Sequence, residues 1–131
     1  MILVDSNIIL DILTRDIKWY EWSARSLAEA AEKNELIIND IIYTEVSIGF
    51  KTIEELEEVI MPNFLIQALP KEALFLAGKA FVKYKKQGGN KNIALPDFFI
   101  GAHAAVKNIS LLTRDTSRYK TYFGSVKLIT P

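Results

Sequence analysis

The chain has 131 residues, of which 50 % are hydrophobic and 24 % charged, a composition typical of one globular domain with its own core. It has no cysteine, which excludes disulfides and thiolate metal sites and is compatible with the cytoplasm, where we expect the protein to act. No apolar run approaches the ~20 residues that span a bilayer and no signal-peptide pattern is present, so we expect no membrane association. The 16 basic and 16 acidic residues cancel, whereas nucleic-acid-binding proteins usually carry a basic excess.

Apolar runs and capping residues predict alternating strands and helices. Ile2–Val4 is apolar at consecutive positions, which favours a buried strand, and the polar residues Asp5 to Asn7 can cap a helix after it. In chain order we predict a strand at 2–4, helices at 8–13 and 19–33, a strand at 36–38, helices from 41 and at 52–60, a strand at 64–69, helices at 70–86 and 97–106, and strands at 108–113 and 126–129. The alternation indicates one α/β domain over residues 1–131 with a mostly parallel central sheet.

The predicted helix at 70–86 has apolar and small residues at helical spacing. They are Leu74, Ala77, Gly78, Phe81 and Tyr84.

Four acidic residues stand beside or within apolar segments, where an acid is hard to explain structurally: Asp5, Glu45, Asp97 and Asp115. Asp5 and Asp115 follow predicted buried strands, at the edge where open α/β sheets bind ligands. Glu45 shares a helical face with apolar residues, and Asp97 opens an almost wholly apolar helix. Unpaired carboxylates in apolar surroundings are costly, and a divalent cation is one common compensation. If the four converge, they make an oxygen-rich site that suits Mg²⁺, with Mn²⁺ as a substitute.

Each acid also has a purely structural explanation. Asp5 and Asp97 stand at helix starts, where a carboxylate caps the backbone or stabilises the helix dipole. Asp115 lies in a polar segment typical of a turn, and Glu45 could pair with a neighbouring basic side chain. The sequence leaves both explanations open for each residue taken alone.

A metal site of this kind permits hydrolysis of a phosphodiester. Ser6, Asn7 and Thr113 would add oxygen ligands or hydrogen bonds. No serine nucleophile with a histidine partner is visible, because His103 is the single histidine and is expected to pack in or beside its apolar helix. Gly88-Gly89 lacks the spacing and the Lys-Ser/Thr of a phosphate-binding loop.

The motifs around the four acids resemble those of a PIN domain, specifically of the VapC-type ribonuclease toxins of type II toxin–antitoxin pairs. The resemblance covers essentially the whole chain. It rests on Met1-Ile-Leu-Val-Asp-Ser-Asn7, Tyr43-Thr-Glu-Val46, Leu95-Pro-Asp-Phe-Phe-Ile-Gly-Ala-His-Ala104 and Leu111-Leu-Thr-Arg-Asp-Thr-Ser-Arg-Tyr119. Each motif is weak alone, but four in this order and spacing are specific. Ser6 replaces the commoner threonine and keeps its hydroxyl.

The resemblance implies a PIN-like three-layer α/β/α sandwich and a Mg²⁺-dependent endoribonuclease. By it, Asp5 and Asp97 would be the most direct Mg²⁺ ligands, and Asp115 would assist directly or through water. Glu45 would orient metal-bound water or ligate a second ion.

The resemblance also implies an RNA substrate, frequent homodimers and a small cognate antitoxin that covers the active site. Arg114, Lys91 and Lys85 are candidate contacts to RNA phosphates, which would make binding sensitive to salt without reading the base sequence.

Two other functions compete with this hypothesis. A non-catalytic PIN-like module that binds RNA or protein would not need four acids. An aspartyl-phosphate phosphatase would want a second acid two residues after Asp5, where the chain has Asn7, and a receiver domain would want an acidic pair near the N-terminus.

Overall fold

A computed structural model describes residues 1–131 as one sheet of five parallel strands with seven helices. The strands are β1 (Ile2–Val4), β2 (Leu36–Ile38), β3 (Leu65–Ile66), β4 (Ser110–Leu112) and β5 (Leu128–Ile129). The helices are α1 (Ser6–Leu13), α2 (Tyr20–Lys33), α3 (Asp40–Ser47), α4 (Ile53–Ile60), α5 (Lys71–Lys86), α6 (Pro96–Lys107) and α7 (Ser117–Tyr122). The predicted three-layer α/β/α architecture with a parallel sheet is confirmed.

The strand order is β3-β2-β1-β4-β5, with β1 at the centre. The chain first adds strands on one side of β1 and then continues on the other, so the connections change direction between β1 and β4. Val4 pairs with Leu112 across that junction, and both are fully buried. In open α/β sheets, the crevice beyond the carboxyl ends of the strands at such a junction is the usual ligand site.

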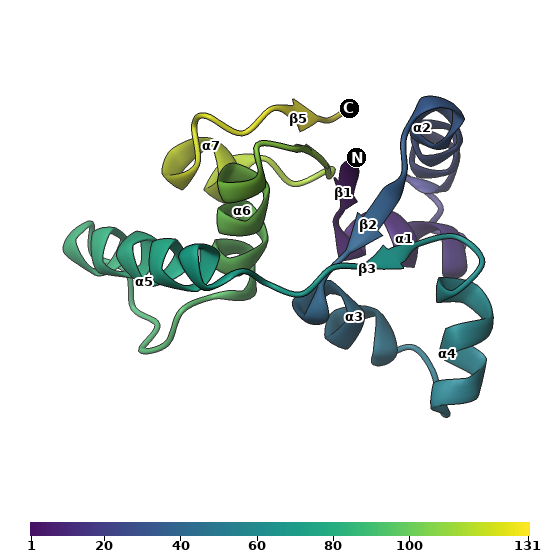
Figure 1. The fold of residues 1–131 in the computed structure, drawn as a ribbon, viewed down its shortest axis with the longest axis horizontal. Coiled ribbons are helices and arrows are strands. Elements are labelled where there is room, and N and C mark those ends of the chain that lie inside the picture. The colour runs from purple at the N-terminus through teal and green to yellow at the C-terminus, as the bar shows by residue number, and fades with distance from the viewer.

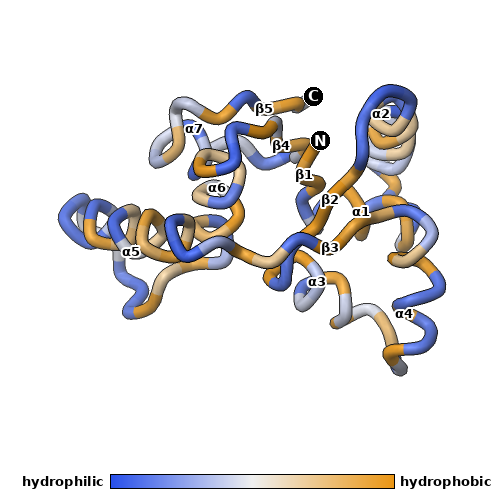
Figure 2. Tube along the Cα trace, in the orientation of Figure 1, coloured by the Kyte–Doolittle hydropathy of each residue, from blue (hydrophilic) through white to orange (hydrophobic).

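The helices gather in two groups around the sheet. Figure 1 shows α5, α6 and α7 at one end of the molecule and α2 and α4 at the other. Helix α1 packs against α2 and α3, while α6 packs against α3, α5 and α7. The strands are strongly hydrophobic (Figure 2), as expected when parallel strands are covered on both faces. The end of α5 that lies farthest from the sheet is strongly hydrophilic.

Local sequence accounts for most of the helix starts. The Asn39 side chain accepts a hydrogen bond from the backbone N–H of Ile42, and Thr52 does the same for Glu55. Pro96 occupies the first turn of α6, where its missing N–H removes no helical hydrogen bond. Helix α6 ends at Asn108, which adopts a left-handed conformation with φ of 54°.

Three predictions about these elements need correction. Helix α7 forms within a segment for which the sequence suggested no helix, and the strand expected over 64–69 is confined to Leu65–Ile66. The helical spacing noted in α5 matches the structure in part. Ala77 is buried and Phe81 and Tyr84 pack against the core, but Leu74 and Gly78 are exposed, while Ala73 and Ala80 are buried as well.

None of the seven helices combines the length and the apolar character needed to cross a membrane.

Candidate functional site

Asp5 lies immediately after β1, at the junction where the sheet connections reverse. Its backbone N–H donates to the carbonyl oxygen of Leu112 at 2.9 Å, which holds the ends of β1 and β4 in register. The residue is also the N-cap of α1 and is only 4 % exposed. The strand register therefore fixes a carboxylate inside the protein at the carboxyl edge of the sheet.

Three short hydrogen bonds from separate elements orient the Asp5 carboxylate. Oδ1 accepts from the backbone N–H of Ser6 at 2.8 Å, and Oδ2 accepts from the hydroxyls of Thr113 and Tyr119, each at 2.8 Å. Asn7 Nδ2 adds a longer contact to Oδ2 at 3.5 Å. All these donors are neutral, and Asp5 makes no ion pair. Burial raises the pKa of Asp5 above its usual value, and the charge of Asp97 adds to the increase.

Glu45 approaches this carboxylate from α3. Its Oε1 accepts a 3.0 Å hydrogen bond from the hydroxyl of Ser6, the residue that follows Asp5. Ser6 is buried and Glu45 half-buried, and Glu45 makes no ion pair. Burial raises the pKa of Glu45, and the charges of Asp5 and Asp97 raise it further. The basic partner that a structural explanation of Glu45 requires is not present.

Asp97 comes from the first turn of α6 and reaches Asp5 through a shared partner. The Tyr119 hydroxyl, which donates to Asp5, also lies 3.4 Å from Asp97 Oδ1. Arg118 Nη1 lies 3.6 Å from Asp97 Oδ2, with both side chains partly exposed. Burial raises the pKa of Asp97; Arg118 opposes the increase and Asp115 adds to it.

Asp115 stands apart from the other three acids. It is exposed, and its Oδ1 accepts from the backbone N–H and the hydroxyl of Ser117 at 3.3 and 3.4 Å. Its backbone is tied to the site, because its N–H and carbonyl oxygen each lie 3.2 Å from the hydroxyl of Thr113. Asn7 Nδ2 also donates to that hydroxyl at 3.2 Å. Asp115 therefore caps the start of α7 at the rim of the site.

The charge of Asp97 raises the pKa of both Asp5 and Glu45, and the charge of Asp5 raises that of Glu45, without an ion pair at Asp5 or Glu45. In this structure no three acidic, histidine or cysteine side chains are arranged so that they could hold a metal ion together. The chemistry of the donors nevertheless suits a hard divalent cation. Carboxylate and hydroxyl oxygens converge on a partly buried place where negative charge is under-compensated.

The predicted RNA-contacting residues lie outside this group of acids. The Arg114 guanidinium forms two hydrogen bonds to Asp11, Nε to Oδ2 at 2.8 Å and Nη2 to Oδ1 at 2.9 Å. The hydroxyl of Ser23 also donates to Asp11, at 2.7 Å. Lys85, near the end of α5, and Lys91, in the following loop, are both exposed and make no ion pair.

His103 is fully buried, as expected, and connects three segments of the chain. Asn39 Nδ2 lies 2.9 Å from His103 Nδ1, and His103 Nε2 lies 2.9 Å from Gln67 Oε1. Because Asn39 Oδ1 already accepts from Ile42, its amide nitrogen is the donor, so Nδ1 accepts and Nε2 carries the proton. Burial lowers the pKa of His103. The neutral imidazole links α6 to β2 and to the residue after β3.

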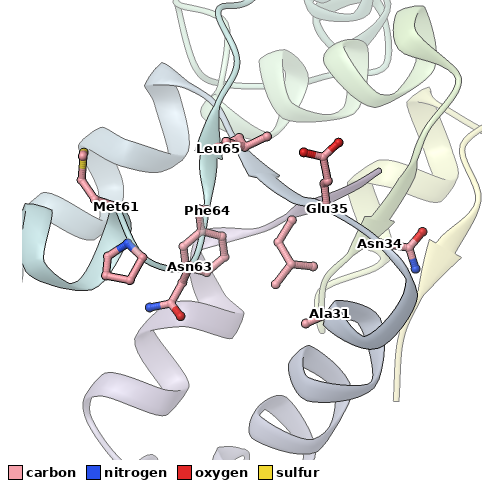
Figure 3. A pocket seen from close by; sticks show the side chains of 9 residues that line it. Ala31, Asn34, Glu35, Met61, Asn63, Phe64 and Leu65 are labelled. Atoms are coloured by element: carbon pink, nitrogen blue, oxygen red, sulfur yellow. The ribbon is translucent and has the colours of Figure 1, made fainter.

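A pocket of about 290 Å³ lies at the amino ends of the strands, on the side of the sheet away from the acids (Figure 3). Its lining includes Glu35 and Leu36 at the amino end of β2 and Phe64 and Leu65 at the amino end of β3. Because the strands are parallel, the acids at the carboxyl ends of β1 and β4 lie on the other side. None of the four acids lines the pocket, so the pocket is not part of the candidate site.

Sequence reasoning missed two residues that shape this region, Tyr119 and Asp11. Tyr119 belongs to a recognised motif, but nothing local predicts that its hydroxyl reaches an aspartate 114 positions earlier. Asp11 is more accessible to such reasoning, because it is an acid within the apolar helix segment Ile8–Leu13. Its side chain is 2 % exposed and pairs with Arg114.

The chain was compared with known proteins. The PIN domain family matches residues 2–124. No curated protein matches the sequence. Solved structures with similar folds include VapBC2 from Rickettsia felis, bound to a DNA fragment from its promoter, with 20 % identity and a TM-score of 0.75 over 100 % of this chain and 99 % of that one.

VapBC-1 from nontypeable Haemophilus influenzae has 20 % identity and a TM-score of 0.73, over 99 % of this chain and 98 % of that one. A toxin–antitoxin complex from Klebsiella pneumoniae has 23 % identity and a TM-score of 0.72, over 100 % of this chain and 98 % of that one. At these identities the structures establish similarity of fold, and the family match covers most of the chain. The chain belongs to the PIN domain family.

Proposed function

We propose that this protein is a Mg²⁺-dependent endoribonuclease of the VapC type, the toxin of a type II toxin–antitoxin pair. The observation that carries the proposal is the Asp5 carboxylate. It is buried at the junction between β1 and β4, is oriented by three neutral donors, and faces two further acids without a basic partner. A capping or packing role alone would not bring Asp5 and Glu45, which have no basic partner, together with Asp97 at this edge.

In this proposal, Asp5 and Asp97 hold the cation and Asp115 assists from the rim, with Mn²⁺ able to replace Mg²⁺. Bound there, the cation supplies a Lewis acid that neutralises phosphate charge and makes water a better nucleophile. Glu45 Oε1 is occupied by the Ser6 hydroxyl, which leaves Oε2 to orient the attacking water. Ser6, Asn7 and Thr113 keep the carboxylates in place.

The substrate of the proposed reaction is RNA. Arg114, Lys91 and Lys85 are the proposed phosphate contacts, and they would act through charge rather than base recognition. Two N–H groups of Arg114, on Nε and Nη2, already donate to Asp11. Arg114 would therefore contact RNA through its remaining N–H groups.

The proposed partners are a cognate antitoxin and a second copy of the chain. Support for the antitoxin comes from the similar folds, which occur in VapBC structures and a toxin–antitoxin complex. Support for a homodimer comes from the exposed apolar residues of the edge strand β3 and of α5. Leu65 and Ile66 are 53 % and 48 % exposed, and Phe75 is 69 % exposed. Light scattering of the purified chain tests the dimer.

Cleavage of an RNA panel with Mg²⁺, with Mn²⁺ and with EDTA tests the enzymatic proposal. Asp97→Asn should abolish metal-dependent cleavage while the fold is retained. Asp40→Asn is the matched control, because Asp40 is an exposed acid in the first turn of α3 and makes no contact with Asp5 or Asp97. It removes a similar helix-dipole interaction and should leave the rate unchanged. Asp97→Asn cutting at the wild-type rate would remove Asp97 from the mechanism.

The alternative is a non-catalytic PIN-like module that binds RNA or protein. It predicts that the folded, cation-binding protein shows no Mn²⁺-dependent turnover on any RNA. The under-compensated acids favour the enzyme, since a module without chemistry has no use for them.

A further inference from the structure

Tyr119 places a single hydroxyl between two of the acids. The side chain is 1 % exposed, in the middle of α7. Its hydroxyl lies 2.8 Å from Asp5 Oδ2 and 3.4 Å from Asp97 Oδ1. It is the one group in the structure that hydrogen-bonds to both carboxylates, which come from the end of β1 and the start of α6.

A tyrosine hydroxyl has one proton to donate, so its two contacts cannot be equivalent. The shorter one, to Asp5, has the usual length of an O–H···O hydrogen bond and takes the proton, and the longer one leaves Asp97 the weaker share of a forked hydrogen bond. The phenol hydroxyl, with an ordinary pKa of about 10, is a neutral donor at neutral pH. A neutral donor can hold two repelling carboxylates together without cancelling the charge that attracts a cation.

The position of Tyr119 is fixed from both ends of its helix. At the start of α7, Arg118 lies 3.6 Å from Asp97, and Asp115 accepts from the backbone N–H of Ser117. Just beyond the end, Phe123 is 4 % exposed and packs directly on Gly101 of α6. The hydroxyl is therefore carried by a helix that cannot shift without disturbing α6.

Asp5 has little freedom once these bonds are made. A carboxylate offers about four lone-pair directions, and the short bonds from Ser6, Thr113 and Tyr119 take three of them. Two of the three are on Oδ2, so the free direction is on Oδ1. Without Tyr119, Asp5 would keep its bonds to Ser6 and Thr113, but Asp97 Oδ1 would lose its hydrogen-bond partner. Asp97 would then be free to rotate away from Asp5.

We propose that Tyr119 is a positioning residue for the cation site: its hydroxyl sets the relative orientation of Asp5 and Asp97 and thereby the affinity for a divalent cation. This inference rests on the proposed function, because it assumes that these two carboxylates hold the cation. Groups that orient metal ligands through hydrogen bonds typically change metal affinity by about 10–100-fold when removed.

The test measures Mn²⁺ binding to the purified protein by calorimetry, with Tyr119→Phe against wild type. Phenylalanine keeps the buried ring and removes only the hydroxyl. We expect the Kd for Mn²⁺ to rise by about 10–100-fold, while cleavage at saturating Mn²⁺ recovers most of the wild-type rate. Tyr122→Phe is the matched control, because Tyr122 is on the same helix and its hydroxyl donates to Gln87, away from the acids. Its Kd should equal that of wild type.

A second measurement does not depend on the variant folding. In wild-type protein with ¹³Cζ-labelled tyrosine, the Tyr119 resonance should shift on addition of Mg²⁺ while that of Tyr122 stays in place. The resonances are assigned by replacing the other four tyrosines one at a time. A folded Tyr119→Phe with wild-type Kd, or an unmoved Tyr119 resonance at saturating Mg²⁺, would overturn the inference and leave the proposed function standing. Wild-type protein that binds neither ion would refute the metal centre itself.

Discussion

Replacing Gly101 by alanine should destabilise the protein and disturb the helix that carries Tyr119. A Cβ atom at Gly101 would lie 2.3 Å from Phe123 Cδ2 and 2.6 Å from Cε2. Such distances are far inside van der Waals contact, and the obstacle is a buried aromatic ring that must move as a unit. Overpacking of this kind costs about 1–3 kcal/mol.

Gly78→Ala is the matched control for this prediction. Gly78 is an exposed glycine inside α5, and a Cβ atom there would meet no atom within 4 Å. The change should raise the free energy of unfolding by about 1 kcal/mol, the usual preference of a helix interior for alanine over glycine. Gly101→Ala gains the same preference, so the difference between the two variants isolates the contact with Phe123. We expect that difference to be about 1–3 kcal/mol.

Urea denaturation followed by circular dichroism measures both free energies, and thermal melts should separate the two variants by several degrees. Shortening the ring should relieve the contact, so Gly101→Ala should cost less in a Phe123→Leu background. If Gly101→Ala were as stable as Gly78→Ala, the close packing of α7 on α6 would be wrong. Helix α7 would then not hold Tyr119 rigidly against α6.

Two further predictions concern charge. Burial raises the folded-state pKa of Asp97, so its contribution to the free energy of unfolding is present at low pH and is lost as pH rises through that pKa. In EDTA, the stability of wild type relative to Asp97→Asn should therefore fall in urea titrations as pH rises above about 4, the ordinary pKa of an aspartate. A rising difference would contradict the effect of burial. Asp11→Asn and Arg114→Gln should each cost about 1–3 kcal/mol, less than a fully buried pair because Arg114 is 31 % exposed. A double-mutant cycle without coupling energy would refute the pair.

The parts of the site that could be predicted from sequence depend on neighbours along the chain. Asp5 directly follows an apolar strand, and Asp97 directly follows Pro96 at a helix start, so local rules place both. The strand order then brings Thr113 beside Asp5, because residues one step beyond paired strand ends are themselves adjacent. Alternating strands and helices predict this parallel pairing without any knowledge of side-chain contacts.

The stripe noted in α5 holds at Ala77, Phe81 and Tyr84 but is wrong at Leu74 and Gly78. Leu74 is 45 % exposed, and the alanines at 73 and 80 are buried instead. Helix α5 packs against α6, and small side chains let the two backbones approach closely. Helix α7 was missed for a different reason. It has six residues, too few for a helical period to show, and its start is capped by Asp115, which the sequence equally allowed as a turn residue.

Asp5 shows why the capping and the site explanations could not be separated from sequence, and the structure adds hydrogen bonds that capping does not require. It is the N-cap of α1, as the structural explanation requires, and one backbone N–H satisfies that role. Two more short hydrogen bonds arrive from Thr113 and Tyr119, whose residues lie more than 100 positions away. A cap needs neither of them. Convergence of neutral donors on a buried carboxylate fixes its orientation and preserves its charge, and a cation-binding acid needs both.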